Sequence, residues 1–304
     1  MGTQKRRWPG VVLAACGLVV FSVLARVDAV EDKGGSARGG GEIRLLVRAD
    51  DMGAAQAVNE ACIESYRRGV ARSVEVIVPG PWFLDAVRLI KQNPDLDVGV
   101  HLTLTSEWDR VKWRPITRAP SLVDRDGYFF PTTSQRADFP PDTGFLTNKP
   151  KLEEVELELR AQVETALRHL GPGRVSHVSA HMGAATATPP LRALTAKLAG
   201  EYKLMLEDGG RAKPAGGIGG PAATPQQREQ MMQDLVNKLT PGQWLLVEHP
   251  GLDTPEMRAL GHKGYENVAE HRSGVTRAFT SERVKRAVSD RGVRLIGYAE
   301  LKGN

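Results

Sequence analysis

Short apolar runs alternate with amphipathic stretches along most of this 304-residue chain. We predict strands, from compact apolar runs, at residues 44–49, 73–78, 97–105, 174–180, 203–207, 243–249 and 293–299. We predict helices, from apolar positions three and four residues apart, at residues 57–69, 82–92, 152–171, 189–202, 226–239 and 281–292. Strands separated by helices favour a parallel α/β fold, and about seven parallel strands favour one irregular TIM-like (β/α) barrel over two domains.

Two stretches interrupt this alternation. Residues 106–150 form an insertion rich in Trp, Pro and Asp, and residues 209–225 are dense in Gly and Pro. Neither shows a sustained helical or strand period, so both are predicted as loops.

The first 29 residues read as a secretory signal peptide. A basic start precedes an apolar run at 11–25, and Ala29 ends a small-residue cleavage pattern. We therefore expect export to the periplasm or the outside. One alternative is a membrane anchor, although the apolar run is shorter than the roughly 20 residues that span a bilayer. Another is a lipoprotein signal that places a lipid on Cys16.

The glycine-rich residues 30–42 are predicted to be a flexible leader, and residues 43–304 a single folded domain with no stable membrane span. Cleavage of the signal peptide at residues 1–29 removes four basic residues and one acidic one, so 41 minus 36 becomes 37 minus 35. A net charge near +2 gives no electrostatic case for nucleic acid. Cys62 then remains alone, which excludes an intramolecular disulfide and favours a buried structural thiol. Nothing in the pattern indicates the oligomeric state.

Five residues of metal-site type lie at or near the carboxyl ends of predicted strands, His101 within its strand. They are Asp50, Asp51, His101, His181 and His249. The carboxyl ends of parallel strands converge at one mouth of a barrel, where active sites are built. One carboxylate and two imidazoles suit a divalent cation, for which zinc is the first choice and magnesium, manganese or cobalt are alternatives. The pattern predicts metal-assisted hydrolysis, with Asp51 as a ligand, Asp50 as general base and His249 as the group that protonates the leaving group.

Each of these residues has a structural alternative. The Asp pair could cap the following helix, and His101 could be a core histidine. His181 and His249 precede turn sequences and could be exposed loop residues. The co-occurrence of all of them at predicted strand ends favours the metal site.

The chain resembles the YdjC-like carbohydrate deacetylases, which include an enzyme that deacetylates chitooligosaccharides. The similar segments, in order, are residues 45–89, 95–108, 176–183, 247–251 and 281–301. The most specific of them are ADDMG at 49–53 and GVHLTLT at 99–105. The resemblance implies an irregular barrel related to polysaccharide deacetylases and metal-dependent removal of an acetyl group from an amino sugar or oligosaccharide. It implies one divalent metal ion on Asp51, His101 and His181, with Asp50 as base and His249 on the acid side.

The chain departs from the family pattern at residues 177–183. Many members have an H-x-D-S-H-H-H run where this chain reads HVSAHMG. His181 keeps the ligand position, whereas Ser179 replaces an Asp and Met182 replaces a His. His177 is expected to orient a ligand or to pack. We expect this departure to affect which sugar is bound more than it affects metal binding.

Aromatic residues of the insertion are candidates for the substrate. Trp108 and Trp113 could stack on a sugar ring or simply pack over the barrel mouth. Arg272 could contact an acyl or carboxylate oxygen if its segment folds over the same mouth. Two other functions stay open, namely a metal-dependent hydrolase of another ester or amide and an exported sugar-binding protein that has lost catalysis. The sequence does not indicate which sugar is used or whether the acetyl group is on nitrogen or oxygen.

Overall fold

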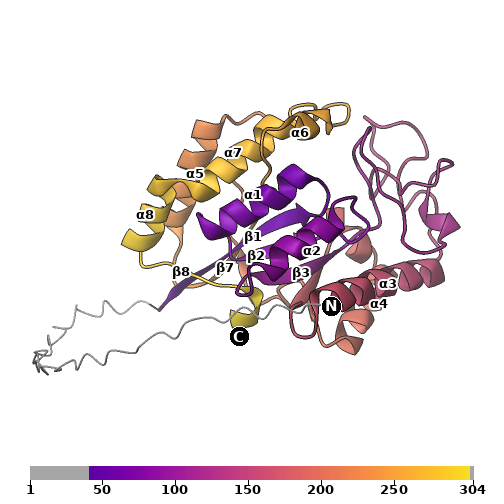
Figure 1. Cartoon of the computed structure of the whole chain (residues 1–304), viewed down its shortest axis with the longest axis horizontal. Coiled ribbons are helices and arrows are strands. Elements are labelled where there is room, and N and C mark those ends of the chain that lie inside the picture. Colours follow the sequence, from indigo (N-terminus) through magenta and orange to yellow (C-terminus); the bar gives the residue numbers. More distant parts are fainter. Residues whose placement is uncertain (1–40, 302–304) are drawn as a thin grey trace, which may run out of the picture. The chain divides into compact units, whose positions relative to one another are not determined.

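A computed structural model describes residues 41–301 (Figure 1). The predicted signal peptide at residues 1–29 and most of the leader at 30–42 lie outside these residues. Between residues 41 and 301, no helix is both long enough and apolar enough to cross a membrane.

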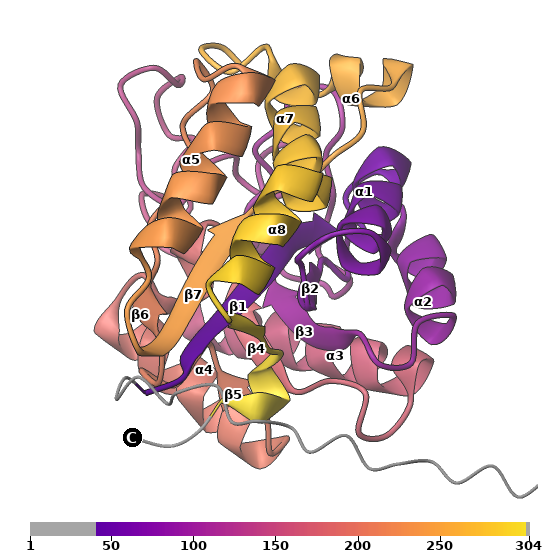
Figure 2. The same cartoon turned by 90° about the vertical axis from the view of Figure 1, so that its left-hand side faces the viewer.

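One parallel sheet forms the centre of the fold. Its strands are β1 Ile43–Met52, β2 Ser73–Val76, β3 Asp97–Leu102, β4 His177–Ala180, β5 Met205–Leu206, β6 Lys213–Pro214, β7 Gly242–Glu248 and β8 Arg294–Leu295. The order across the sheet is β5-β4-β3-β2-β1-β7-β6, and β8 pairs with the start of β1. The described residues show no pairing between the edge strands β5 and β6, so the curled sheet is a half-barrel (Figure 2). The predicted α/β class with about seven parallel strands is confirmed.

Helices cover the outer face of the sheet. They are α1 Gln56–Arg67, α2 Phe83–Lys91, α3 Leu152–Leu170, α4 Pro189–Glu201, α5 Pro225–Lys238, α6 Pro255–Ala259, α7 Val268–Thr280 and α8 Glu282–Asp290, with 3₁₀ turns η1 Pro120–Leu122, η2 His181–Thr186 and η3 Tyr298–Glu300. Helices α4, α3, α2, α1, α7 and α5 follow one another in that order, each in contact with the next. This order matches the strand order, as expected when each helix returns the chain to the neighbouring parallel strand.

The central strand β1 is buried on both faces. Leu45 and Val47 belong to the main apolar core, while Leu46 belongs to a second cluster with Ile296 and Tyr298. Successive side chains of a strand point to opposite faces. The inner face of the half-barrel is therefore closed by the C-terminal segment that carries Tyr298.

The structure differs from the sequence prediction mainly in short elements. The strand predicted at 293–299 is reduced to β8, because the chain turns into η3 to place Tyr298 inside the half-barrel. The strand β6 lies in the predicted loop 209–225, and neither α6 nor the 13-residue helix α7 was predicted. Gly274 in the middle of α7 weakens the helical pattern of that segment. Elements of two to five residues are too short to show a period.

Candidate active site

The adjacent acids Asp50 and Asp51 lie at a β-bulge near the carboxyl end of β1. The pairing of β1 with β2 shifts register between Ala49 and Met52, and Asp51 has a φ of 73°, which is rare for a non-glycine residue. Neighbouring side chains of a regular strand point to opposite faces. Here, in contrast, Asp50 Oδ2 and Asp51 Oδ1 lie 3.7 and 3.6 Å from one atom, His101 Nε2.

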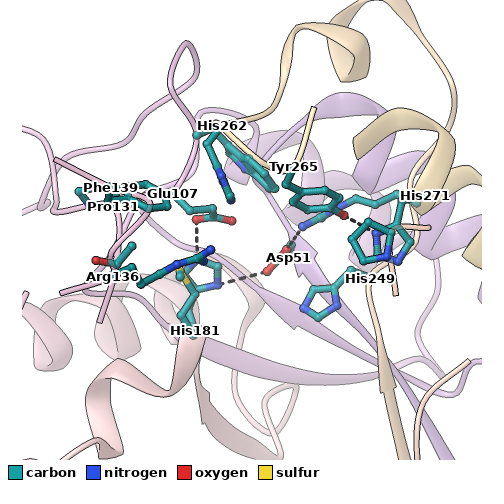
Figure 3. Close-up of a pocket in the computed structure, with 15 residues that line it drawn as sticks. Asp51, Glu107, Pro131, Arg136, Phe139, His181, His249, His262, Tyr265 and His271 are labelled. Atoms are coloured by element: carbon teal, nitrogen blue, oxygen red, sulfur yellow. Dashed lines mark hydrogen bonds and ion pairs between the residues drawn. The ribbon is translucent and has the colours of Figure 1, made fainter. Parts of the chain in front are cut away.

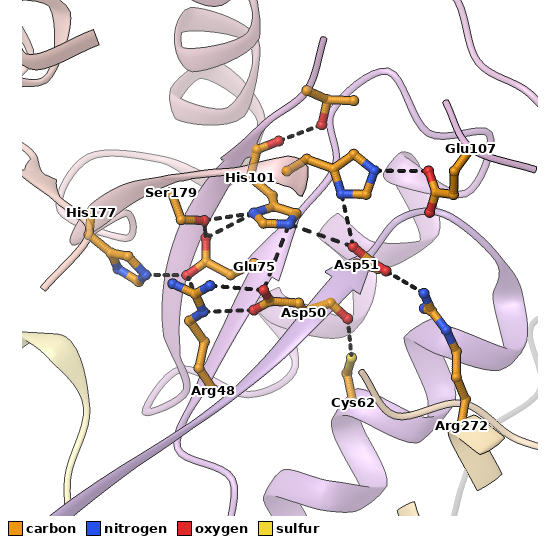
Figure 4. A network of polar contacts seen from close by, with 12 residues as sticks. Arg48, Asp50, Asp51, Cys62, Glu75, His101, Glu107, His177, Ser179 and Arg272 are labelled. Carbon is orange, nitrogen blue, oxygen red and sulfur yellow. Dashed lines mark hydrogen bonds and ion pairs between the residues drawn. The ribbon is translucent and has the colours of Figure 1, made fainter. Parts of the chain in front are cut away.

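The structure brings together the three residues predicted as metal ligands. Asp51, His101 and His181 each offer a ligand atom within 4.8 Å of the other two, and all three side chains are buried (Figure 4). Asp51 Oδ1 is 3.3 Å from His181 Nδ1 but, among the described residues, has no hydrogen-bond partner. An unpartnered buried carboxylate oxygen facing two imidazole nitrogens fits a cation. Tetrahedral ligands at about 2.1 Å from a metal lie about 3.4 Å apart, close to the observed separations.

His181 is held by a second carboxylate on its far side. Its Nε2 lies 3.0 Å from Glu107 Oε2, so Nε2–H donates to Glu107 and Nδ1 faces Asp51. Burial would lower the pKa of His181, but Glu107 and Asp51 outweigh this and raise the pKa to about 10. Without another cation, His181 therefore carries a proton that a metal would have to displace.

His101 is neutral by contrast. Burial, reinforced by the charge of His181, lowers the pKa of His101 to about 3. Its Nδ1 lies 2.7 Å from Ser179 Oγ on β4, which leaves Nε2 directed at the two aspartates.

Asp50 is oriented by an arginine of its own strand. Arg48 donates to both Asp50 oxygens, from Nε at 2.7 Å and from Nη2 at 2.9 Å, and also donates to the Tyr298 hydroxyl at 2.9 Å. Burial would lower the pKa of Arg48, but Asp50 and Glu75 outweigh this and raise it well above its usual value. This bidentate contact holds the Asp50 carboxylate beside His101.

A pocket of about 370 Å³ opens over this site (Figure 3). Asp51, Glu107, His181, His249 and Arg272 line it, whereas Asp50 and His101 do not, although His101 Nε2 lies 3.6 Å from Asp51 Oδ1. A volume in this range is typical of a small-ligand site. The pocket therefore gives a substrate access to Asp51 and His181.

The far wall of the pocket carries two imidazoles. His249, which follows β7, is half-buried and has no hydrogen-bond partner within residues 41–301, and Figure 3 shows it on the opposite side of Asp51 from His181. The His271 Nδ1 lies 2.6 Å from the Tyr265 hydroxyl, and burial lowers the pKa of His271 to about 4. His249 is thus the less constrained imidazole at the pocket.

Arg272 comes from α7 and reaches the site through Asp51. Its Nη2 donates to Asp51 Oδ2 at 2.7 Å, while its buried Nε has no hydrogen-bond partner in the described part of the chain. Burial would raise the pKa of Asp51, but Arg272 and then His249 outweigh this and hold it well below its usual range. Arg272 thus occupies one oxygen of Asp51 and leaves the other for a cation.

The predicted aromatic residues lie at different depths. Trp108 lines the pocket, but its side chain is 2% exposed and packs against Arg272 and His262. Trp113 is equally buried, donates its indole N–H to the Thr105 carbonyl and does not line the pocket. Trp113 packs against the His181 ring in a T-shaped arrangement, and substrate contact by Trp108 stays a prediction.

His177 lies away from the three ligand atoms. Its ring is fully buried, its Nε2 is hydrogen-bonded to Glu75, and it stacks on Tyr298. In the described part of the chain, its hydrogen-bond link to His101 runs through Glu75 and Ser179.

Several residues of the site were missed in the sequence, among them Arg48, Glu75, Glu107, Tyr265 and Tyr298. Glu75 carried a signal, because it is a charged residue between valines of a short apolar run. Glu107 and Tyr265 lie in segments without a period, so only the folded chain brings them to the pocket.

Comparison with known proteins agrees with this architecture. The sequence model of a family described as YdjC-like protein matches residues 44–290. A carbohydrate deacetylase of Thermus thermophilus is 33% identical over 243 residues, which are 73% of this chain and 82% of that protein. A carbohydrate deacetylase of Enterococcus faecalis is 27% identical over 85% of this chain and 98% of that protein. The solved structure of an Enterococcus faecalis protein, described as a suspected cellobiose-phosphate cleavage protein, has a TM-score of 0.68 and 26% identity, and covers 86% of this chain and 100% of that one.

Proposed function

This chain belongs to the YdjC-like family, and from that premise we propose that it is a carbohydrate deacetylase that uses a divalent metal ion to remove an acetyl group from an acetylated sugar or oligosaccharide. Curated relatives that match most of the chain are carbohydrate deacetylases. The observation that carries the proposal is Asp51 Oδ1, which accepts no hydrogen bond within residues 41–301 and lies buried between His101 and His181, in a residue that lines the pocket.

Asp51, His101 and His181 would hold the metal through one carboxylate oxygen and two imidazole nitrogens. When bound, a divalent cation would polarise the acetyl carbonyl and lower the pKa of a water molecule. Zinc is the metal we propose first, because two imidazoles and one carboxylate with open positions form a common catalytic zinc set.

Asp50 is proposed as the general base. Its carboxylate lies 3.7 Å from His101 Nε2, directly beside the proposed ligands, and Arg48 holds both of its oxygens. In this position Asp50 would accept the proton of the attacking water. The fixed orientation supports the role, because proton transfer requires hydrogen-bond reach of the reacting group.

His249 is proposed as the general acid. It lines the pocket across Asp51 from His181, and its ring has no hydrogen-bond partner among residues 41–301. His249 would donate a proton to the sugar atom that leaves as acetate departs. Arg272 would hold Asp51 in place throughout, through the 2.7 Å bond to Oδ2.

We also propose that the chain is exported, since its first 29 residues carry the sequence pattern of a signal peptide. An acetylated sugar outside the cytoplasm would then be the natural substrate class. To test this localisation, acetate release is measured in fractions of cultures that produce the full chain and of cultures that produce the chain without residues 1–29.

The experiment that tests the function is acetate release from a panel of acetylated mono- and oligosaccharides. Wild-type protein is assayed after metal loading and after chelation. We expect release that chelation abolishes and added metal restores. Release from simple esters or amides but from no sugar would favour another hydrolase, and sugar binding without release in metal-loaded protein would favour a binding protein.

A further inference from the structure

A fully buried carboxylate lies behind the proposed metal ligands. Glu75 of β2 is 0% exposed, and its Oε1 is hydrogen-bonded to His177 Nε2 while its Oε2 accepts from the Ser179 hydroxyl. Its Oε2 is 3.9 Å from His101 Nδ1, and its Oε1 is 3.9 Å from Arg48 Nε. Glu75 thus lies between the proposed ligand His101 and the arginine that orients Asp50 (Figure 4).

The hydrogen-bond chain from Glu75 sets the tautomer of His101. An ionised carboxylate only accepts, so the single proton of Ser179 Oγ points to Glu75. The Ser179 oxygen must then accept from His101 Nδ1–H at 2.7 Å. The remaining ring nitrogen, Nε2, is left bare and faces Asp51 Oδ1 at 3.6 Å.

The chain makes room for this buried carboxylate at one specific position. A Cβ added to Gly99 of β3 would lie about 2.5 Å from both Glu75 oxygens and closer still to His177 Nε2. Real Cβ atoms essentially never approach other atoms so closely. Glycine at this strand position therefore admits the Glu75–His177 pair between β2 and β4.

We propose that Glu75 is a positioning residue of the active site. Acting through Ser179, it holds the His101 ring with Nε2 free for the metal, and acting on Arg48 it supports the orientation of Asp50. The inference rests on the proposed function, because it assigns the outer partner of a proposed metal ligand. Such partners typically change metal affinity by about 10- to 100-fold when removed.

The first test removes only the bridging hydroxyl. Ser179→Ala keeps the Glu75–His177 pair but breaks the link to His101, and Ser179→Thr restores a hydroxyl. The matched control is Ser176→Ala, which removes the hydroxyl on the other side of the same network, 2.7 Å from His177 Nδ1. Isothermal titration with zinc alone should show a roughly 10- to 100-fold weaker Kd for Ser179→Ala. The Kd values of Ser176→Ala and Ser179→Thr for zinc should stay within about threefold of the wild-type value.

Equal affinities for Ser179→Ala and Ser176→Ala would overturn the proposal. A second measurement does not depend on metal binding or turnover. Long-range ¹⁵N–¹H spectra of histidine-labelled protein without metal should show His101 protonated at Nδ1 in the wild type and a tautomer mixture in Ser179→Ala.

A wild-type His101 protonated at Nε2 would contradict the positioning role even if the enzyme were active. If His101 shows the expected tautomer but the protein releases no acetate, the positioning role of Glu75 stands and only the deacetylase function is rejected.

Discussion

Metal binding should be in competition with one proton on His181. Glu107 and Asp51 raise the pKa of His181 to about 10, against the effect of burial, whereas the pKa of His101 is lowered to about 3. At pH 8 His181 is therefore protonated and His101 is not. This pH is about two units below the pKa of His181, and each unit corresponds to about 1.4 kcal/mol. Displacing the proton therefore costs about 3 kcal/mol, which lowers the apparent metal affinity roughly 100-fold.

The sign of this effect is fixed by the raised pKa. Metal affinity should increase about tenfold for each unit of pH between 6 and 8, because the protonated fraction of His181 competes with the metal throughout that range. Titration calorimetry in buffers of different ionisation enthalpy should detect about one proton released per metal bound.

The variant Glu107→Gln tests whether Glu107 causes the raised pKa of His181. It removes the neighbouring charge that raises the pKa of His181 most, so fewer protons should be released at pH 8 and the pH dependence should flatten. Glu60→Gln on the exposed face of α1 is the control and should behave as wild type. Affinity that does not change with pH, or metal uptake without proton release, would refute the reasoning.

Three further predictions concern single residues. Asp50→Asn should keep metal affinity within a few-fold but lower kcat by about 10²- to 10⁴-fold, since only the base is removed; undiminished turnover would exclude that role. Arg272→Met should lower the free energy of unfolding by about 3–5 kcal/mol in denaturant titrations without metal, because Asp51 Oδ2 loses its buried partner. Gly99→Ala should lower it by about 1–3 kcal/mol and weaken metal binding, through overpacking against Glu75; wild-type stability would show that the space is not needed.

The long elements of the fold, apart from helix α7, were predictable from the sequence because each buries one regular face. The strand ends that carry Asp50, His101 and His249 follow clear apolar runs, and parallel strands bring such ends together. Both aspartates were predicted at the same mouth, but the backbone geometry that brings their side chains together was not, because it depends on a bulge and on the positive φ of Asp51. A period-2 pattern would have placed them on opposite faces.

The supporting residues were harder to identify for a different reason. Glu75 acts from a neighbouring strand, and its partners His177 and Ser179 are more than 100 positions away in the chain. Glu107 follows β3 in an irregular segment, and Tyr265 lies in a loop far from any predicted strand end. Nothing local in the sequence links these residues to the metal ligands, so only the packing of the sheet reveals the contact.

The most direct test of the central claim compares two histidine variants on the best acetylated sugar of the panel. His101→Ala removes a proposed metal ligand, and His169→Ala removes a histidine of α3 that lies outside the pocket lining, where it packs against Phe83. With saturating metal, we predict that acetate release is lost in His101→Ala and unchanged in His169→Ala, while both proteins stay folded. Acetate release by His101→Ala at the wild-type rate would contradict the proposed site.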